Sequence, residues 1–218
     1  MTQSVVSEIS NNLMFRYRIP CLQIKKDTRQ PEQIGKPYEL PEFCSVDDGL
    51  PYATLRAAWS ETGMYFWIKV EGKKQSLWCK RTQLLESDGL QLWIDTRDTH
   101  NLHRATKFCH WFLFLPQGDG HDEKQPIATM LKINRAREHS PSINQAKMEI
   151  ACKSTKGGYT LSTFIPGAVL NGWNPNEHKQ IGFSYSVYDR EMGLQHLSVG
   201  SEYPVTEDPS LWHTHELN

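Results

Sequence analysis

The sequence predicts an all-β protein: an antiparallel β-sandwich of jelly-roll type that forms a single domain with minor helical turns. Short segments in which apolar and polar residues alternate recur along the chain, and a period of about two residues is typical of strands with one buried face. Polar turns separate these segments, and no stretch sustains the helical period of about 3.6 residues. Many short strands joined in this way indicate a sandwich or jelly roll.

The chain is long enough to form one complete core. Its 218 residues lie within the range of about 200–250 residues that a single all-β sandwich often occupies. No shift in composition marks a boundary, so we interpret residues 1–218 as one domain. Residues 1–14 are polar, and we expect them to form a loose N-terminal arm.

The first strands are predicted by alternation and by turn residues. Phe15–Ile24 is expected to be a strand in which Pro20 restricts pairing to an edge or a bulge. Ala53–Ser60 and Met64–Glu71 flank a short turn that ends in Gly63, where glycine suits a positive φ. Together these two segments predict a β-hairpin.

The rest of the chain continues this pattern. Gly72–Glu86 is expected to be a loop with a short helical turn, and Pro166–Leu170 another helical turn. Lys147–Cys152 and Tyr159–Ile165 flank a Gly-Gly turn and predict a second hairpin. The remaining strands are expected at Leu90–Asp95, Lys107–Leu115, Ile127–Asn134, Gln180–Tyr188 and Leu211–Leu217.

Composition and charge bear on location and partners. With 24 basic and 25 acidic residues the net charge is -1, so no overall field attracts nucleic acid or anionic lipid, and we expect neither nucleic acid nor membrane as a partner. The five cysteines lack CxxC spacing, and the N-terminus lacks a basic region followed by an apolar one. These features predict a cytoplasmic protein with reduced thiols. The sequence leaves the oligomeric state open.

The strand Gly89–Asp95 has two unlike faces. Its apolar face carries Leu90, Leu92 and Ile94, whereas Gln91, Trp93 and Asp95 share the other face. A tryptophan between polar groups suits a sugar, because a pyranose presents C–H bonds on one face and hydroxyls at its rim. We therefore expect Gln91 and Trp93 to form an aromatic platform with Tyr65 and Trp67 of the preceding hairpin. The structural alternative is that these aromatic residues are covered by loops.

Other candidates lie in loops. Trp78 and Trp173 have polar or Gly/Pro/Asn-bearing surroundings, where side chains often carry function, although each could also cover an end of the sandwich. Arg97 and His110 lie at the two ends of the densest polar cluster in the sequence. This cluster could bind an anion or an acidic sugar, or it could be a solvated loop. The ligand-binding residues we expect are Trp67, Trp78, Gln91, Trp93, Arg97, His110 and Trp173.

Metal and catalytic signals are weak. His213 and His215 face the same way on a strand, which could supply two metal ligands, but apolar neighbours favour structural histidines. Calcium could be bound by the carboxylate oxygens of four aspartates, which lack the DxDxDG spacing: Asp88, Asp95, Asp119 and Asp122. No cofactor is assigned with certainty. Motifs such as GxSxG, HExxH, a P-loop and GxGxxG do not occur.

Four segments in this order resemble the family 9 carbohydrate-binding modules and the wider group of DOMON-like sandwiches. These segments are YFWIKVEG (Tyr65–Gly72), SDGLQLWIDTRD (Ser87–Asp98), GGYTLSTFIPGAVL (Gly157–Leu170) followed by IGFSYSVYDR (Ile181–Arg190), and DPSLWHTHEL (Asp208–Leu217). The resemblance covers the chain from about Ala53 onward. It implies a jelly-roll sandwich that holds a sugar on a concave sheet face or in a slot between loops, without catalysis.

The resemblance also implies where a sugar would be held. In family members that bind sugar ends, two tryptophans clamp the ring, one before the DGLQLWID-like strand and one before the DPS-like turn. This chain has Leu85 and Glu86 at the first place, and Thr206 and Glu207 at the second.

The sequence therefore predicts a non-catalytic carbohydrate-binding protein whose partner is a saccharide or a sugar-linked small molecule. One alternative is an enzyme or an anion- or metal-binding protein that uses the Arg97–His110 loop. Another alternative is a protein-interaction module whose aromatic face receives a protein partner.

Overall fold

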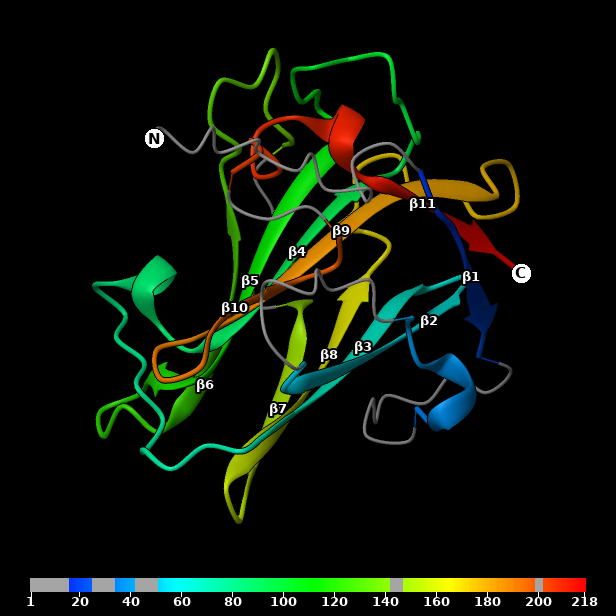
Figure 1. The fold of residues 1–218 in the computed structure, drawn as a ribbon. Coiled ribbons are helices and arrows are strands. Elements are labelled where there is room, and N and C mark those ends of the chain that lie inside the picture. The colour runs from blue at the N-terminus through cyan, green and yellow to red at the C-terminus, as the bar shows by residue number, and fades with distance from the viewer. Residues whose placement is uncertain (1–15, 25–33, 42–50, 142–146, 199–201) are drawn as a thin grey trace, which may run out of the picture.

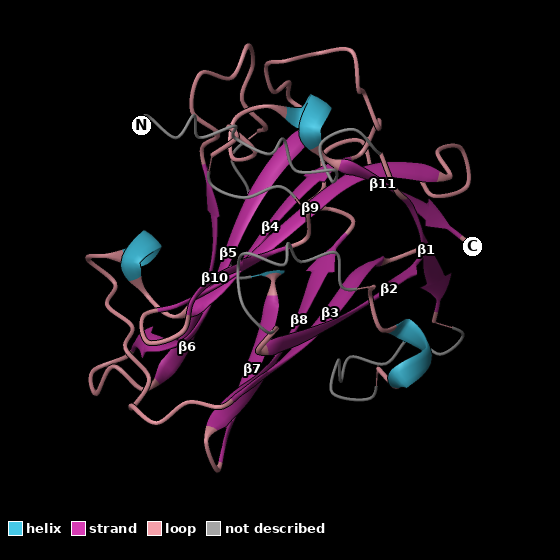
Figure 2. Ribbon diagram, in the orientation of Figure 1, coloured by secondary structure: helices cyan, strands magenta, loops and turns pink. Residues whose placement is uncertain are grey.

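The computed structural model describes residues 16–24, 34–41, 51–141, 147–198 and 202–218. The expected N-terminal arm and Cys44 lie outside these residues. The fold is almost entirely β, and its strands form two sheets packed face to face (Figures 1 and 2). Regular helix within the described residues is limited to short 3-10 turns. The predicted fold class is confirmed.

Each sheet is a run of antiparallel neighbours. The first sheet contains, in spatial order, β6 (Gln125–Leu131), β5 (Cys109–Asp119), β4 (Gly89–Asp95), β9 (Gln180–Asp189) and β11 (His213–Leu217), and β10 (Gly193–His196) pairs with the end of β9. The second sheet contains β2 (Ala53–Ser60), β3 (Gly63–Glu71), β8 (Gly158–Pro166) and β7 (Glu149–Thr155). The 3-10 turns are η3 (Lys36–Tyr38), η5 (Leu84–Glu86) and η7 (Pro209–Leu211).

Strand β1 (Arg18–Gln23) joins the two sheets and is parallel to both of its neighbours (Figure 1). It pairs with β11 over Arg18–Cys21 and with β2 only from Leu22 onward. The carbonyl of Cys21 accepts a hydrogen bond from the chain after β11, so the backbone of the preceding Pro20 faces the other way, where no strand is paired at that position. The missing N–H of Pro20 therefore breaks no ladder bond, although β1 lies between β11 and β2 and is not the edge strand that Pro20 was expected to require.

Both predicted hairpins are present. Gly63 in the first hairpin has φ +154, and a Cβ there would lie 2.2 Å from Ile165 O, so only glycine fits this turn. Strand β10 was not predicted, because GLQH is too short to show alternation. Its pairing with β9 creates one wall of the site described below.

The core lies between the sheets. Alternate residues of β3, β4, β5 and β9 point inward, and Phe66 of the second sheet stacks on Phe183 of the first with ring centroids 5.8 Å apart. The aromatic residues at the other parity, including Trp67 and Trp93, consequently lie on the outward faces of the two sheets. This alternation decides which side chains can reach a ligand.

A buried ion cluster fixes the start of β4 against the end of β9. The Lys73 ammonium lies 3.1 Å from Asp88 Oδ2 and 2.6 Å from Asp189 Oδ2, and all three side chains are almost inaccessible to solvent. The remaining carboxylate oxygens accept backbone N–H groups, from Arg190 to Asp88 and from Glu191 to Asp189. Burial alone would lower the pKa of Lys73, but its hydrogen bonds to the two carboxylates outweigh this and raise that pKa.

The described cysteines carry free thiols, and burial raises the pKa of Cys21, Cys79 and Cys109 to about 12. Thiols with such a pKa remain protonated and unreactive near neutral pH. Among the described residues, no helix has the length and apolar character needed to cross a membrane.

Candidate functional site

The outward face of the first sheet carries a groove of about 530 Å³. The floor of the groove is formed by Trp93 of β4 and by the small Ser186 of β9, which leaves space above it because a serine side chain is short. A groove of this size lies within the range of about 300–1,000 Å³ typical of small-ligand sites. Its lining residues are Trp93, Tyr185, Ser186, Leu194, His196, Glu202, Tyr203, Pro204, Val205, Thr206 and Glu207.

Two segments form the walls of the groove. Strand β10 supplies Leu194 and His196, which pair with Tyr188 and Ser186 of β9 in register. The opposite wall is the segment 202–207, which has no regular structure of its own. Its backbone is nevertheless held, since Trp212 Nε1 donates a hydrogen bond of 2.8 Å to the carbonyl of Val205.

Glu207 is held in place at the rim of this wall. The amide of Asn134 donates a hydrogen bond of 2.7 Å to Glu207 Oε1, and the Arg135 guanidinium lies 3.9 Å from its Oε2. Thr206 and Glu207 are the residues that stand at the second clamp position implied by the family resemblance. The structure thus places that position on the wall of the groove. Leu85, at the first position, is 51% exposed on η5.

Trp93 forms part of the floor and is only 2% exposed. Its ring stacks on Trp111 at 5.7 Å, and Trp111 Nε1 donates to Gln91 Oε1 at 3.1 Å. Trp93 also packs in one cluster with Trp212, which supports the 202–207 wall. The structure therefore brings Gln91 and Trp93 to the same face, with Trp93 as a rigid floor and not as an open platform.

Trp67 and Tyr65 do not join them. Both lie on the outward face of the second sheet, on the opposite side of the sandwich, in a cluster with Ile34 and Phe164. The Arg56 guanidinium covers Trp67 at 4.3 Å from the ring centroid. The expected platform of Tyr65, Trp67, Gln91 and Trp93 is therefore wrong as a single surface, because the two strands belong to different sheets.

The loop tryptophans also occupy separate places. Trp78 is half-buried beside the end of β9, beneath the guanidinium of Arg190 at 4.3 Å. Trp173 packs against the core and donates its Nε1 to Glu61 O at 3.1 Å. Trp173 thus closes an end of the sandwich, which was the structural alternative, and a role for it in binding stays a prediction.

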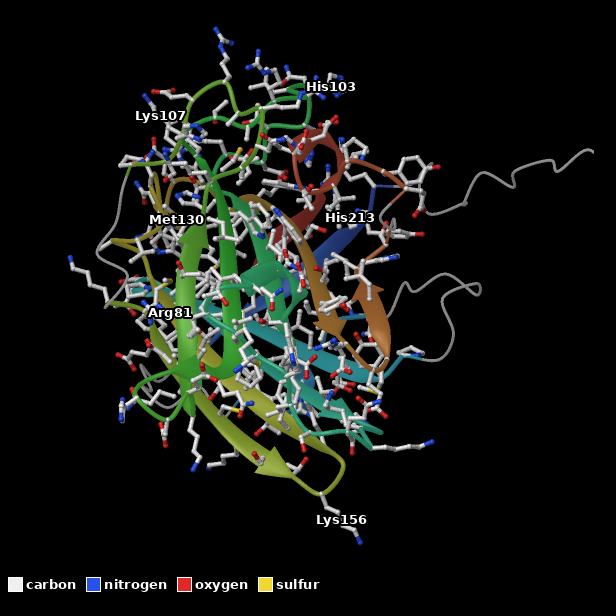
Figure 3. All side chains as sticks on the ribbon, turned by 90° about the vertical axis from the view of Figure 1, so that its left-hand side faces the viewer. Arg81, His103, Lys107, Met130, Lys156 and His213 are labelled. Carbon is white, nitrogen blue, oxygen red and sulfur yellow. The ribbon has the colours of Figure 1, made fainter. Side chains whose placement is uncertain are left out.

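The Arg97–His110 loop projects from one end of the sandwich, where His103 and Lys107 are labelled in Figure 3. Arg97 covers Phe108 at 4.4 Å and donates to the carbonyl of Gly172 at 2.7 Å. His110 points into the core, where its Nε2 accepts the Asn171 N–H at 2.9 Å. Burial lowers the pKa of His110 to about 4. Neither residue lines the groove, so their predicted hydrogen bonds to a ligand would require another site.

The candidate metal ligands are not grouped. His213 and His215 point into the core from β11, and His215 stacks on Phe183 at 3.9 Å. Of the four aspartates, Asp88 contacts Lys73, and Asp95 accepts backbone N–H groups of Arg97 and Thr99. Asp119 pairs with Arg81, and Asp122 lies 3.8 Å from Lys124. In the part of the chain that the structure describes, no group of three or more His, Cys, Asp or Glu side chains is arranged to hold a metal ion.

Sequence reasoning missed several residues of the groove. Ser184 and Ser186 alternate with Phe183 and Tyr185 on β9, and such small outward side chains beside a tryptophan are a signal that could have indicated the floor. Tyr203 and His196 gave no such signal, because they belong to a loop wall and to the short β10. Their contribution depends on tertiary pairing with β9.

A sandwich that presents a groove on the outward face of one sheet has the architecture of a ligand-binding module. Residues 38–217 match the model of the carbohydrate family 9 binding domain-like family, and the chain belongs to that family. The predicted resemblance to family 9 carbohydrate-binding modules is confirmed. A comparison with curated proteins found no match.

Solved structures show the same fold. The chain resembles a family 9 carbohydrate-binding module from Caldicellulosiruptor kristjanssonii in complex with cellotriose, with a TM-score of 0.63 and 12% identity over 93% of this chain and 94% of that one. A family 9 carbohydrate-binding module from the same organism in complex with glucose gives a TM-score of 0.63 and 12% identity, over 93% of this chain and 96% of that one.

Proposed function

We propose that this protein is a non-catalytic carbohydrate-binding module and that it holds its saccharide in the groove between β10 and the 202–207 segment. One observation carries this proposal: the groove has the volume of a small-ligand site and includes Thr206, where the family pattern expects a clamp residue. The family match supports it, as do the glucose and cellotriose complexes of similar modules.

The chemistry of the groove suits a sugar ring. Tyr203 supplies an aromatic surface for the C–H face, and Trp93 supplies an apolar floor. Around them the hydroxyls of Ser186 and Thr206 can donate or accept hydrogen bonds, and the Glu207 carboxylate can accept hydrogen bonds from the hydroxyls at the rim of a ring. Tyr203 thus takes the place of an aromatic clamp that the pair Leu85 and Thr206 cannot form.

A titration with a saccharide panel tests this function. The panel comprises glucose, xylose, galactose and mannose with their di- and trisaccharides. Isothermal calorimetry and tryptophan fluorescence measure the binding of each sugar. We expect saturable binding, and we expect Tyr203→Ala to weaken it by about tenfold, equivalent to about 1.4 kcal/mol.

The matched control is Tyr38→Ala, which removes a tyrosine from the opposite side of the sandwich, where Tyr38 packs against the cluster around Tyr65. This variant should bind as the unmodified protein does, with its fold checked by thermal melting. Binding that survives Tyr203→Ala unchanged would place the sugar outside the groove. A protein that binds none of the panel would refute the proposed function.

A further inference from the structure

We propose that the groove continues along β9 and β10 to a second sugar subsite formed by Trp78 and Arg190, so that the protein binds a neutral oligosaccharide in preference to a single sugar. This inference rests on the proposed function, because the first ring must lie in the groove. It assigns a role to a surface that the groove itself does not include.

The register of β10 on β9 defines the path between the two subsites. His196 pairs with Ser186 at the groove, and Leu194 pairs with Tyr188 one step further along the same outward face. Leu194 is 37% exposed and offers an apolar surface on which a ring can lie. Strand β9 ends at Asp189, and Arg190 follows as the first residue of the turn to β10, four residues beyond Ser186 and about 13 Å from it at extended spacing. A single pyranose ring cannot cover this distance, whereas a short oligosaccharide can.

The subsite at the end of this path is held in place from below. The buried carboxylate of Asp88 accepts the backbone N–H of Trp78 at Oδ2 (3.0 Å) and that of Arg190 at Oδ1 (2.8 Å). The same carboxylate is neutralised by Lys73, at 3.1 Å. One buried group therefore fixes the backbones of both residues, so that no backbone ordering is needed at these two positions when a ligand binds.

The side chains of this pair suit a sugar hydroxyl rim. The Arg190 guanidinium carbon lies over the Trp78 ring, 4.3 Å from the ring centroid, and within the described chain no hydrogen bond or ion pair to this guanidinium is found. Its N–H groups are therefore available to paired hydroxyls, while the exposed part of Trp78 can contact C–H bonds.

The local charge favours a neutral ligand. Three cations (Lys73, Lys74 and Arg190) and three carboxylates (Asp88, Asp189 and Glu191) are linked by the contacts around this pair, and the formal charges of these six residues cancel. A surface with no net field has no general attraction for an anion. The same donors that would bind a carboxylate can instead bind neighbouring hydroxyls.

Chain length is the variable that tests this inference. Isothermal calorimetry would compare glucose, cellobiose and cellotriose, then xylose, xylobiose and xylotriose, and then maltose and maltotriose, with the full chain and with Arg190→Met and Trp78→Ala. In the unmodified protein we expect the trisaccharide of the recognised series to bind about tenfold more tightly than the shortest member, equivalent to about 1.4 kcal/mol. Both variants should lose this gain and keep the affinity for the shortest sugar.

Lys179→Met is the matched control, because Lys179 lies over Trp59 at 5.3 Å in a comparable cation–aromatic pair near the joint of the two sheets. This variant should keep the full gain with length. Equal affinity for sugars of all lengths in the unmodified protein would overturn the second subsite and leave the proposed function intact. An increase of affinity with sugar length that persists in both variants would do the same. If no sugar of any length binds, both proposals fail together. Arg190→Met keeps the stem that covers Trp78, so it separates loss of donors from loss of folding.

Discussion

At the scale of single residues, Lys73 contributes to the site without lining the groove. Its ammonium connects Asp88 before β4 to Asp189 at the end of β9, and Asp189 in turn accepts the N–H groups of Glu191 and Met192 in the turn to β10. The position of the β10 wall therefore depends on a buried charge. Such a charge is costly when its partner is removed, because the remaining carboxylates stay in a medium of low dielectric.

Lys73→Met is expected to destabilise the protein by about 3–5 kcal/mol, the range for breaking a buried ion pair from one side. Urea unfolding followed by fluorescence would measure this change. Lys80→Met is the control, because Lys80 is 43% exposed and pairs with the exposed Glu123, and such surface pairs contribute about 0–1 kcal/mol. Equal losses in the two variants would show that the buried position of Lys73 is irrelevant.

At the scale of the element, β11 brings two histidines into the core. Burial lowers the pKa of His213 to about 4, and burial lowers the pKa of His215 to about 3, with a further contribution from His213. Both nitrogens of His215 are buried and find no hydrogen-bond partner among the residues that the structure describes. Both residues are therefore neutral in the folded strand, between β1 and β9, and protonating them opposes this packing.

The free energy of unfolding is expected to fall as the pH falls below 6.5, the ordinary histidine pKa, toward about 3. In this window the unfolded chain binds protons that the folded chain does not, so each depressed histidine contributes a slope of about 1.4 kcal/mol per pH unit. Above pH 6.5 this contribution to the free energy of unfolding is fully present. Urea unfolding at a series of pH values would measure the slope.

His215→Phe should reduce that slope by about 1.4 kcal/mol per pH unit, the contribution of one proton. Phenylalanine can keep the contact with Phe183 but cannot titrate. Leu217→Ala serves as the control on the same strand, because it removes buried contacts but no titratable group, and it should leave the slope unchanged. A slope that His215→Phe does not alter would mean that other groups cause the acid sensitivity.

At the scale of the whole molecule, β1 makes two sheets into one folding unit. Its Ile19 is 1% exposed and packs in the shared core, and the strand bonds to β11 on one side and β2 on the other. Ile19→Ala should cost about 2–5 kcal/mol. Because both sheets depend on this strand, fluorescence and far-UV circular dichroism should report one coincident transition.

The control for this prediction is Leu22→Ala on the same strand, at a side chain that is 37% exposed. Its effect should stay within about 0.5 kcal/mol, as for most surface substitutions. Two resolved transitions in Ile19→Ala would indicate that the sheets unfold independently and that β1 does not couple them.

Much of this architecture could be predicted because alternation is a local property. The hairpin around Gly63 and the strands at Leu90–Asp95 and Gln180–Tyr188 were predicted nearly to the residue. The assignment of Trp67 and Trp93 to opposite outward faces could not be, since it depends on which strands pair across the sandwich. The groove was missed for the same reason: β10 and the 202–207 wall acquire their roles only through contacts with β9 and Trp212.

The parallel pairing of β1 with β11 also has a mechanical consequence. Arg18 lies beside Thr214 and Cys21 beside Leu217. The beginning of β1 and the end of β11 are therefore at opposite ends of this pair of strands. A pulling force transmitted through Arg18 and Leu217 would slide the two strands past each other and load their hydrogen bonds together. In shear geometry of this kind, bonds must fail as a group, whereas an antiparallel pair pulled from one end opens one bond at a time.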